Sequence, residues 1–113
     1  MSIDIDLEIN TGKHTVFVVE VGNYTHNVQP MWRKALKAAS GSDYGLCDLN
    51  GTRASESIPV LEKAVKHMRE NKEEYLPLNP TNGWGNYEGA LQYLETLLEC
   101  CQEHPLCTIA TSC

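Results

Sequence analysis

Basic residues are scarce in this chain. It carries 9 Lys and Arg against 15 Asp and Glu, which gives a formal net charge of −6 and a pI near 5.1. The only concentration of positive charge, in Trp32–Lys37, is small. A protein that follows nucleic-acid phosphates or an anionic membrane needs a basic face. The composition therefore argues against both kinds of partner.

The sequence also lacks a long hydrophobic run and an obvious leader. No stretch approaches the length of a transmembrane helix. The acidic N-terminal residues stand where a signal peptide needs a basic start followed by an apolar run. The 5 cysteines are odd in number and form no CxxC pair, a pattern that suits reduced thiols better than a disulfide framework. We therefore expect a cytoplasmic protein.

Phosphate-loop and metal-binding motifs are missing as well. There is no GxxxxGK[ST] and no GxGxxG after a strand. Cys101, His104 and Cys107 have a C-x2-H-x2-C spacing that superficially suggests zinc. Pro105 interrupts this spacing, however, and a structural zinc site needs a fourth ligand. We expect structural thiols, no bound metal and no cofactor.

The N-terminal part of the chain predicts a β-hairpin. The length of 113 residues and the 42% hydrophobic content fit one domain over residues 1–113. Residues 2–9 alternate apolar and acidic side chains, as in a strand with one buried and one wet face. A turn at Asn10–Lys13 leads to a β-branched and aromatic run at 14–22. Because this run is more continuously apolar, we expect it to be the more central strand.

Three helices and a last strand should follow. The first is expected over 30–40, capped by Asn27 or Gln29 and ended by Gly41, and a loop covers 41–52. The second covers roughly 55–71, with Pro59 marking either its start or a kink. A β-prone run at 106–112 returns to the sheet.

The third helix has the clearest periodicity of the three. Its apolar stripe is expected at these positions: Trp84, Tyr87, Leu91, Leu94, Leu98 and Cys101. The order ββαααβ predicts an α+β domain in which a three-stranded sheet packs against three helices.

The segment Gly22–Asn27 is unusually polar for a strand-to-helix connection. It holds Asn23, Tyr24, Thr25, His26 and Asn27, all able to form hydrogen bonds. Binding groups gather on such connections because a rigid scaffold holds them in place. The same residues also fit a purely structural role, in which Asn27 or Thr25 caps the helix.

A second unusual segment opens the third helix. Asn82 is a natural cap, and Gly83 and Gly85 flank Trp84. Glycine in a first helical turn costs about 1 kcal/mol relative to alanine, so a pair of them needs a reason. They either make a tight helix entry or leave backbone N–H groups open to an anionic ligand at the positive end of the helix dipole. Trp84 fits either the core or a stacking wall.

The two segments together resemble a small family of uncharacterised proteins encoded by bacteriophages and some bacteria. The resemblance rests on an N-x-T-H-N segment, Asn23–Asn27, followed by an N-G-W-G-x-Y-E segment, Asn82–Glu88, and extends from about Asn23 to the C-terminus. It implies an accessory protein acting in the host cytosol. Such a protein would either capture a host immune nucleotide signal or block a host defence protein.

Three functional hypotheses remain open at this point. The first is a non-catalytic module that binds a small polar, nucleotide-like ligand, with homo-oligomerisation through a sheet edge or face. The second is an inhibitor that presents Glu88, Glu95 and Glu99 to a basic partner. The third is a hydrolase or lyase using His26 and Glu88. The candidate ligand-binding residues are Asn23, Thr25, His26, Asn27, Asn82, Gly83, Trp84, Gly85, Tyr87 and Glu88.

Overall fold

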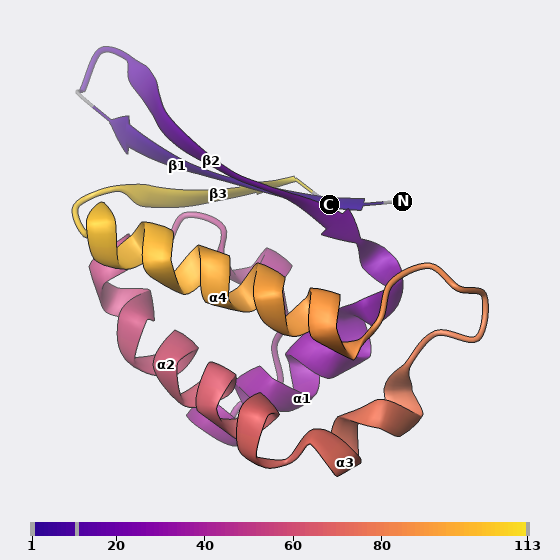
Figure 1. Cartoon of the computed structure of the whole chain (residues 1–113). Coiled ribbons are helices and arrows are strands. Elements are labelled where there is room, and N and C mark those ends of the chain that lie inside the picture. Colours follow the sequence, from indigo (N-terminus) through magenta and orange to yellow (C-terminus); the bar gives the residue numbers. More distant parts are fainter. Residues whose placement is uncertain (1, 11, 113) are drawn as a thin grey trace.

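The computed structural model describes residues 2–10 and 12–112, and the side chains of Asn10 and His26 are not described. Its elements are β1 (Ser2–Asn10), β2 (Thr15–Thr25), η1 (His26–Val28), α1 (Gln29–Ser40), η2 (Leu46–Leu49), α2 (Ala54–Glu70), α3 (Lys72–Tyr75), η3 (Leu76–Leu78), α4 (Tyr87–Glu103) and β3 (Thr108–Ser112). The three long helices lie on one side of a three-stranded antiparallel sheet (Figure 1). The predicted α+β fold is confirmed, with the short α3 as an addition.

The sheet has the order β2-β1-β3, so the N-terminal strand is its centre. The prediction that the second strand is the more central one is wrong. β1 pairs with β2 on one side and with β3 on the other. Its Ile3, Ile5 and Leu7 are fully buried against the helices, which confirms the period-two pattern of this strand. Burial on one face, with a partner on each edge, is what places β1 at the centre.

Strand β2 is longer than the sequence predicted. It continues through Thr25, and its last residues pair with β1 at Ser2↔Thr25, Ile3↔Tyr24 and Asp4↔Asn23. Two register shifts, between Ile5 and Asp6 and between Leu7 and Glu8, bend the strand. Most of the segment predicted as a connection is therefore strand, which fixes the Asn23 and Thr25 backbones by ladder hydrogen bonds.

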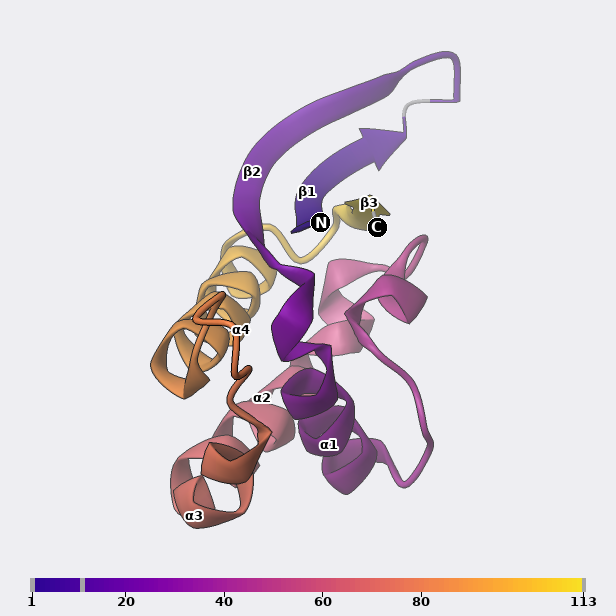
Figure 2. The ribbon, with the colours of Figure 1, turned by 90° about the vertical axis from the view of Figure 1, so that its right-hand side faces the viewer.

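The far end of the β1–β2 hairpin extends beyond the helices (Figure 2). The molecule measures 46 × 27 × 22 Å along its principal axes. In the projecting part, Ile9, Val16 and Phe17 are 41%, 47% and 57% exposed. The hydrophobic alternation that buries the first half of β1 thus continues into a region where no helix covers it.

Helices α1 and α2 start differently from the prediction. The N-cap of α1 is Val28, which forms no side-chain cap, so neither Asn27 nor Gln29 caps this helix. Gly41 ends it in the left-handed conformation, as predicted, with its N–H donating to the Lys37 carbonyl. Helix α2 begins at Ala54 and continues through Pro59.

Helix α4 begins at Tyr87, so Trp84 lies outside it. Its N-cap is Asn86, whose side chain accepts a hydrogen bond from the Gly89 N–H; the prediction of Asn82 as cap is wrong. The buried face is also rotated from the predicted stripe, because Leu91 and Leu98 are only half-buried. The residues that α4 buries are Tyr87, Ala90, Tyr93, Leu94, Leu97 and Cys101.

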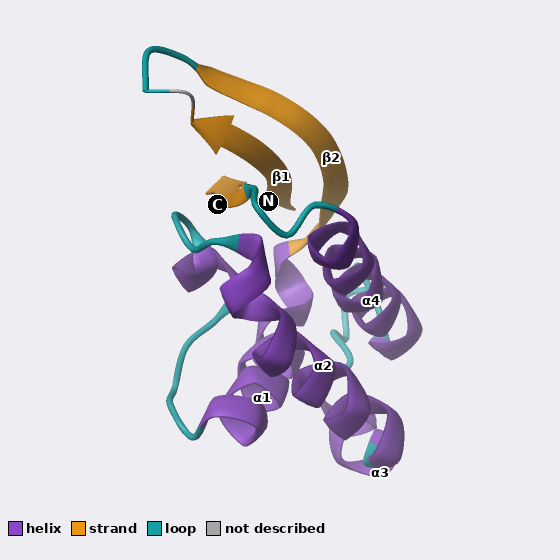
Figure 3. Ribbon diagram, turned by 90° about the vertical axis from the view of Figure 1, so that its left-hand side faces the viewer, coloured by secondary structure: helices purple, strands orange, loops and turns teal. Residues whose placement is uncertain are grey.

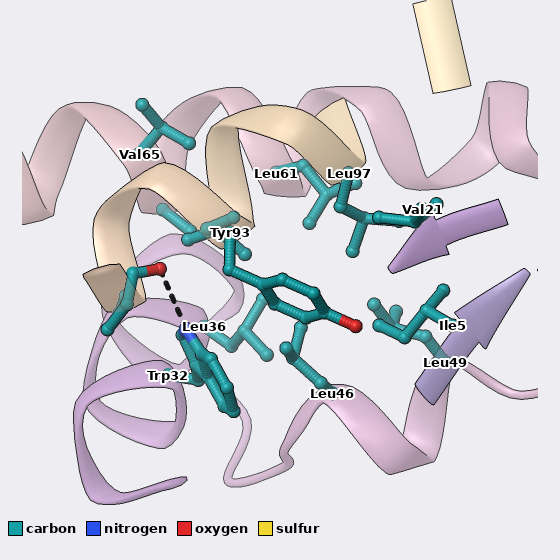
Figure 4. Close-up of a cluster of buried hydrophobic side chains, with 14 of the residues drawn as sticks. Ile5, Val21, Trp32, Leu36, Leu46, Leu49, Leu61, Val65, Tyr93 and Leu97 are labelled. Atoms are coloured by element: carbon teal, nitrogen blue, oxygen red, sulfur yellow. Dashed lines mark hydrogen bonds between the residues drawn. The ribbon is translucent and has the colours of Figure 1, made fainter. Parts of the chain in front are cut away.

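One continuous core of buried side chains joins the sheet to the helices. Figure 3 shows these helices on one side of the sheet. At its centre Trp32 donates from Nε1 to the Ala90 carbonyl at 3.0 Å, which ties α1 to α4 (Figure 4). The Tyr93 hydroxyl donates to the Gly22 carbonyl of β2 at 2.8 Å. The indole N–H and the phenol hydroxyl are therefore both buried with a hydrogen-bond acceptor.

The cysteines depart from the expectation of uniformly reduced thiols. Cys47 is disulfide-bonded, whereas Cys100, Cys101 and Cys107 are free thiols. Burial raises the pKa of the Cys101 thiol to about 12, which keeps it protonated and unreactive. Within the described ranges, no helix combines the length and the apolar character needed to cross a bilayer.

Candidate functional site

The two polar segments singled out in the sequence meet at one hollow on the surface. The hollow has a volume of about 680 Å³. Its lining residues are Ser2, Asn23, Tyr24, Thr25, Asn27, Asn82, Trp84 and Gly85. Figure 1 shows the segment that precedes α4 returning beside η1 and the end of β2. Fold topology thus brings together six of the ten predicted ligand-binding residues.

Gly85 allows the two segments to touch. Its φ is 91°, in the left-handed region that favours glycine. A Cβ at this position would overlap Cγ2 of Thr25 and lie 2.9 Å from Cγ1 of Val28. Gly83 also has a positive φ of 79°, but a Cβ there would meet nothing within 4 Å. The glycines therefore shape a turn and a close contact, and not the first turn of a helix.

Tyr24 forms the wall between the hollow and the core. Its ring stacks on Tyr93 with centroids 6.1 Å apart and meets Trp32 edge-on at 6.2 Å. Its hydroxyl oxygen accepts a hydrogen bond from the Asn86 N–H at 3.2 Å. Tyr24 was not among the predicted ligand-binding residues, although it lies inside the N-x-T-H-N segment. Ser2 was also missed, since only strand pairing brings it beside Thr25.

Carboxamides supply most of the polar atoms of the hollow. Asn27 Nδ2 donates to Thr25 Oγ1 at 3.0 Å, which leaves its Oδ1 as an acceptor. Asn82 Oδ1 accepts from the Trp84 N–H at 3.0 Å, which leaves its Nδ2 as a donor. The Asn23 side chain is exposed on the outer end of β2. The hollow therefore offers both donors and acceptors from side chains whose orientation is already fixed by one bond.

Trp84 is the most accessible large aromatic of the hollow. It is 68% exposed, whereas Trp32 is fully buried. Of the two roles that the sequence left open for Trp84, a place in the core is excluded by this exposure. An indole held by an Asx turn beside carboxamides presents a flat apolar surface to any molecule that enters.

The backbone donors at the start of α4 are already in use. The Tyr87 N–H donates to Asn79 Oδ1 at 2.9 Å, and the Gly89 N–H donates to Asn86 Oδ1 at 2.8 Å. The Asn86 N–H is held by Tyr24. Side chains of the chain itself therefore occupy these three N–H groups, and Gly83 and Gly85 precede the helix rather than opening its first turn. The expectation that Gly83 and Gly85 open N–H groups to an anionic ligand stays a prediction.

Three further predicted residues lie away from the hollow. Tyr87 is buried and its hydroxyl donates to the Met68 carbonyl, and burial raises its pKa. Glu88 is exposed and forms an ion pair with Lys72 at 3.6 Å. Gly83 turns the chain without lining the hollow. The His26 backbone belongs to η1, and its side chain lies outside the described part of the structure.

The acidic row predicted on the third helix is partly neutralised. Glu95 accepts from Arg69 at 2.6 Å, and Glu88 is paired with Lys72. Two of the three carboxylates proposed for a basic partner are therefore engaged within the molecule. Among residues 2–10 and 12–112, no three His, Cys, Asp or Glu side chains lie close enough together to hold a metal ion.

The hollow is electrically neutral over the side chains that the structure describes. Its lining has hydroxyl, carboxamide, phenol and indole groups but no carboxylate, ammonium or guanidinium. Comparison with protein-family models, with curated proteins and with solved structures finds no match to the chain.

Proposed function

We propose that this protein is a non-catalytic module that binds a small, flat, polar molecule of the nucleoside type. The observation that carries the proposal is an exposed indole, Trp84, beside three carboxamides in a hollow of about 680 Å³. Small-molecule sites commonly have volumes of roughly 300–1,000 Å³. Stacking of a base on an aromatic side chain contributes about 1–3 kcal/mol.

The hydrogen-bonding groups suit the edge of a nucleobase. One free carboxamide donor and one free carboxamide acceptor match an acceptor and a donor on the edge of a base such as adenine. Asn82 Nδ2 and Asn27 Oδ1 are the atoms left over after internal bonding. In the proposed complex the ring lies on Trp84, and these two atoms approach its polar edge.

The absence of charge in the lining points to the base and sugar as the recognised parts. No Lys or Arg lines the hollow among the described residues, and the net charge of −6 repels anions. A phosphate would therefore extend into solvent. The role implied by the resemblance to phage proteins, sequestration of a host signalling nucleotide, requires this binding and nothing more.

The two tryptophans provide the test. Trp84 is exposed and Trp32 is buried, so quenching of intrinsic fluorescence by a stacked base reports on Trp84. We expect saturable quenching when adenosine, guanosine, cytidine or uridine is titrated, with at least one of the four preferred. AMP should bind within about threefold of adenosine, because no cation in the lining contacts phosphate.

Substitutions distinguish binding at the hollow from nonspecific binding elsewhere on the surface. Trp84→Ala should weaken binding about tenfold or more in calorimetric titration, as expected for a lost stacking platform. The paired variant Asn27→Ala/Asn82→Ala should also weaken it, because it removes the free amide acceptor and donor and the Asx turn at Trp84. Leu106→Ala, at an apolar residue that is 75% exposed and outside the hollow, is the matched control. Absence of saturable binding for all four nucleosides at millimolar concentration would overturn the proposal.

A further inference from the structure

The sheet has two outer edges, and the chain covers only one of them. At β3, the Gly51 N–H donates to the Ile109 carbonyl and the Ile109 N–H donates to the Thr52 carbonyl, both at 2.8 Å. The Thr111 N–H is taken by Asn50 Oδ1 at 2.9 Å. The segment 50–53 therefore seals this edge. Over the described residues, no backbone segment pairs with the outer side of β2 at 15–21.

The open part of β2 lacks most of the features that keep an edge strand from pairing. Residues 15–19 read T-V-F-V-V, without charge, proline or glycine. Natural edges are blunted by charged residues, proline, bulges or a covering segment. Of these devices, residues 15–19 have only the bulge at the Leu7–Glu8 register shift. An uncovered strand of strong β propensity is a template for a further strand.

The same region exposes apolar side chains on both faces of the sheet, which beyond Glu8 narrows to the two strands β1 and β2. Val16 pairs with Ile9 on one face, and Phe17 pairs with Glu8 on the other. The three apolar residues Ile9, Val16 and Phe17 are 41% to 57% exposed. Figure 3 shows that the β1–β2 hairpin extends past the helices. A two-stranded ribbon alone is marginally stable in water, so a further strand would add both hydrogen bonds and apolar cover.

We propose that this edge pairs with the same edge of a second copy of the chain, forming an antiparallel, twofold-symmetric dimer centred near Phe17. The charge pattern favours this occupant. Lys13 precedes the uncharged segment, and Glu20 follows it. Antiparallel apposition brings the basic start of each segment toward Glu20 of the other copy, so the surface is complementary to itself.

The interface leaves the hollow accessible. The paired segment ends before Asn23, and the hollow is built from Asn23, Thr25 and the 82–85 loop. The dimer is therefore independent of nucleoside binding and carries two separate hollows. Since each copy has a net charge of −6, repulsion between copies opposes association and is screened by salt.

Sedimentation equilibrium of the wild-type chain tests the proposal directly. We expect a monomer–dimer equilibrium between 1 and 200 µM protein, shifted toward dimer when NaCl is raised from 50 to 500 mM. Hydrogen exchange followed by mass spectrometry should show slower exchange of the amides at 15–19 at the higher protein concentration. A strictly monomeric chain at 200 µM and 500 mM NaCl overturns the proposal.

Single substitutions locate the interface. Phe17→Lys places two like charges close to the twofold axis and should raise the dimer dissociation constant by more than about tenfold. Val16→Lys should act in the same direction. Leu106→Lys, which adds the same charge at a residue 75% exposed elsewhere, should leave the equilibrium unchanged. If dimers persist in both strand variants, or dissociate in the Leu106 variant, the interface is not at β2.

Discussion

The packing of Gly89 against Tyr24 makes a prediction that opposes simple helix propensity. Gly89 lies in the first turn of α4, where alanine is ordinarily the better residue by roughly 1 kcal/mol. A Cβ at Gly89, however, would lie 2.5 Å from Cζ of Tyr24 and closer still to its hydroxyl oxygen. The tyrosine ring has little room to retreat, because Trp32 and Tyr93 pack on it at 6.2 and 6.1 Å.

The expected size of the effect follows from three opposing contributions. Forcing a methyl group into a packed site costs about 1–3 kcal/mol. Moving the tyrosine hydroxyl also breaks its bond from the Asn86 N–H, which is worth about 1 kcal/mol. The propensity gain offsets roughly 1 kcal/mol of this total. We therefore expect Gly89→Ala to destabilise the protein by about 2 kcal/mol, which for a domain of this size lowers Tm by about 8 °C.

Urea unfolding followed by circular dichroism measures this difference. Gln92→Ala, at an exposed position of the same helix, controls for the effect of alanine on α4 and should change stability by less than about 0.5 kcal/mol. In a Tyr24→Leu background the clash is removed, and Gly89→Ala should become stabilising. A wild-type chain that gains stability from Gly89→Ala would refute the close packing of Tyr24 on α4.

Two other predictions concern the helix cap and the buried hydroxyl of Tyr93. Asn86→Ala should lower the free energy of unfolding in urea by about 1 kcal/mol, because the Gly89 N–H loses its acceptor. Asn86→Ser should retain most of the stability. An equal loss in both variants would exclude the side-chain cap. Burial raises the pKa of Tyr93 above its ordinary value of 10.0, and the nearby carboxylates of Asp4, Asp6 and Glu20 raise it further. Burial also raises the pKa of Cys101 from 9.0 to about 12. As pH rises, the unfolded chain therefore releases these protons at a lower pH than the folded chain does. The free energy of unfolding should be at its full value below pH 9 and fall between pH 9 and 11, with a shallower fall in Tyr93→Phe. A urea midpoint that stays flat across this range would contradict the burial of both groups.

Local patterns were sufficient to predict the elements but not their arrangement. The alternation of Ile3, Ile5 and Leu7 identified β1, and the apolar periods identified the helices. The position of β1 at the sheet centre was missed because an alternating pattern reports one buried face and says nothing about how many edges are paired. The extension of β2 through Thr25 was missed because Asn23 and Tyr24 pair with β1 in spite of their polarity.

The candidate site was predictable in part for a similar reason. Two polar segments stood out, and the fold brings both to one hollow. The start of α4 was misplaced because Asn82 and Asn86 are equally good caps by residue type. Asn86 is selected by tertiary contacts, since its N–H bonds Tyr24 and its neighbour Tyr87 packs in the core. No sequence window contains that information.

The central position of β1 has a consequence for how the chain is made. The strand at the middle of the sheet leaves the ribosome before every other element of the domain, while its partner β3, which pairs Ser112 with Asp4, leaves after all of them. Until then the nascent chain holds Ile3, Ile5 and Leu7 in a hairpin with one side of β1 unpaired. Closing the sheet requires contact between segments at opposite ends of the described chain, which is a slow, nonlocal step in folding. Productive folding during synthesis therefore depends on keeping the unpaired side of β1 from other contacts until β3 has been made.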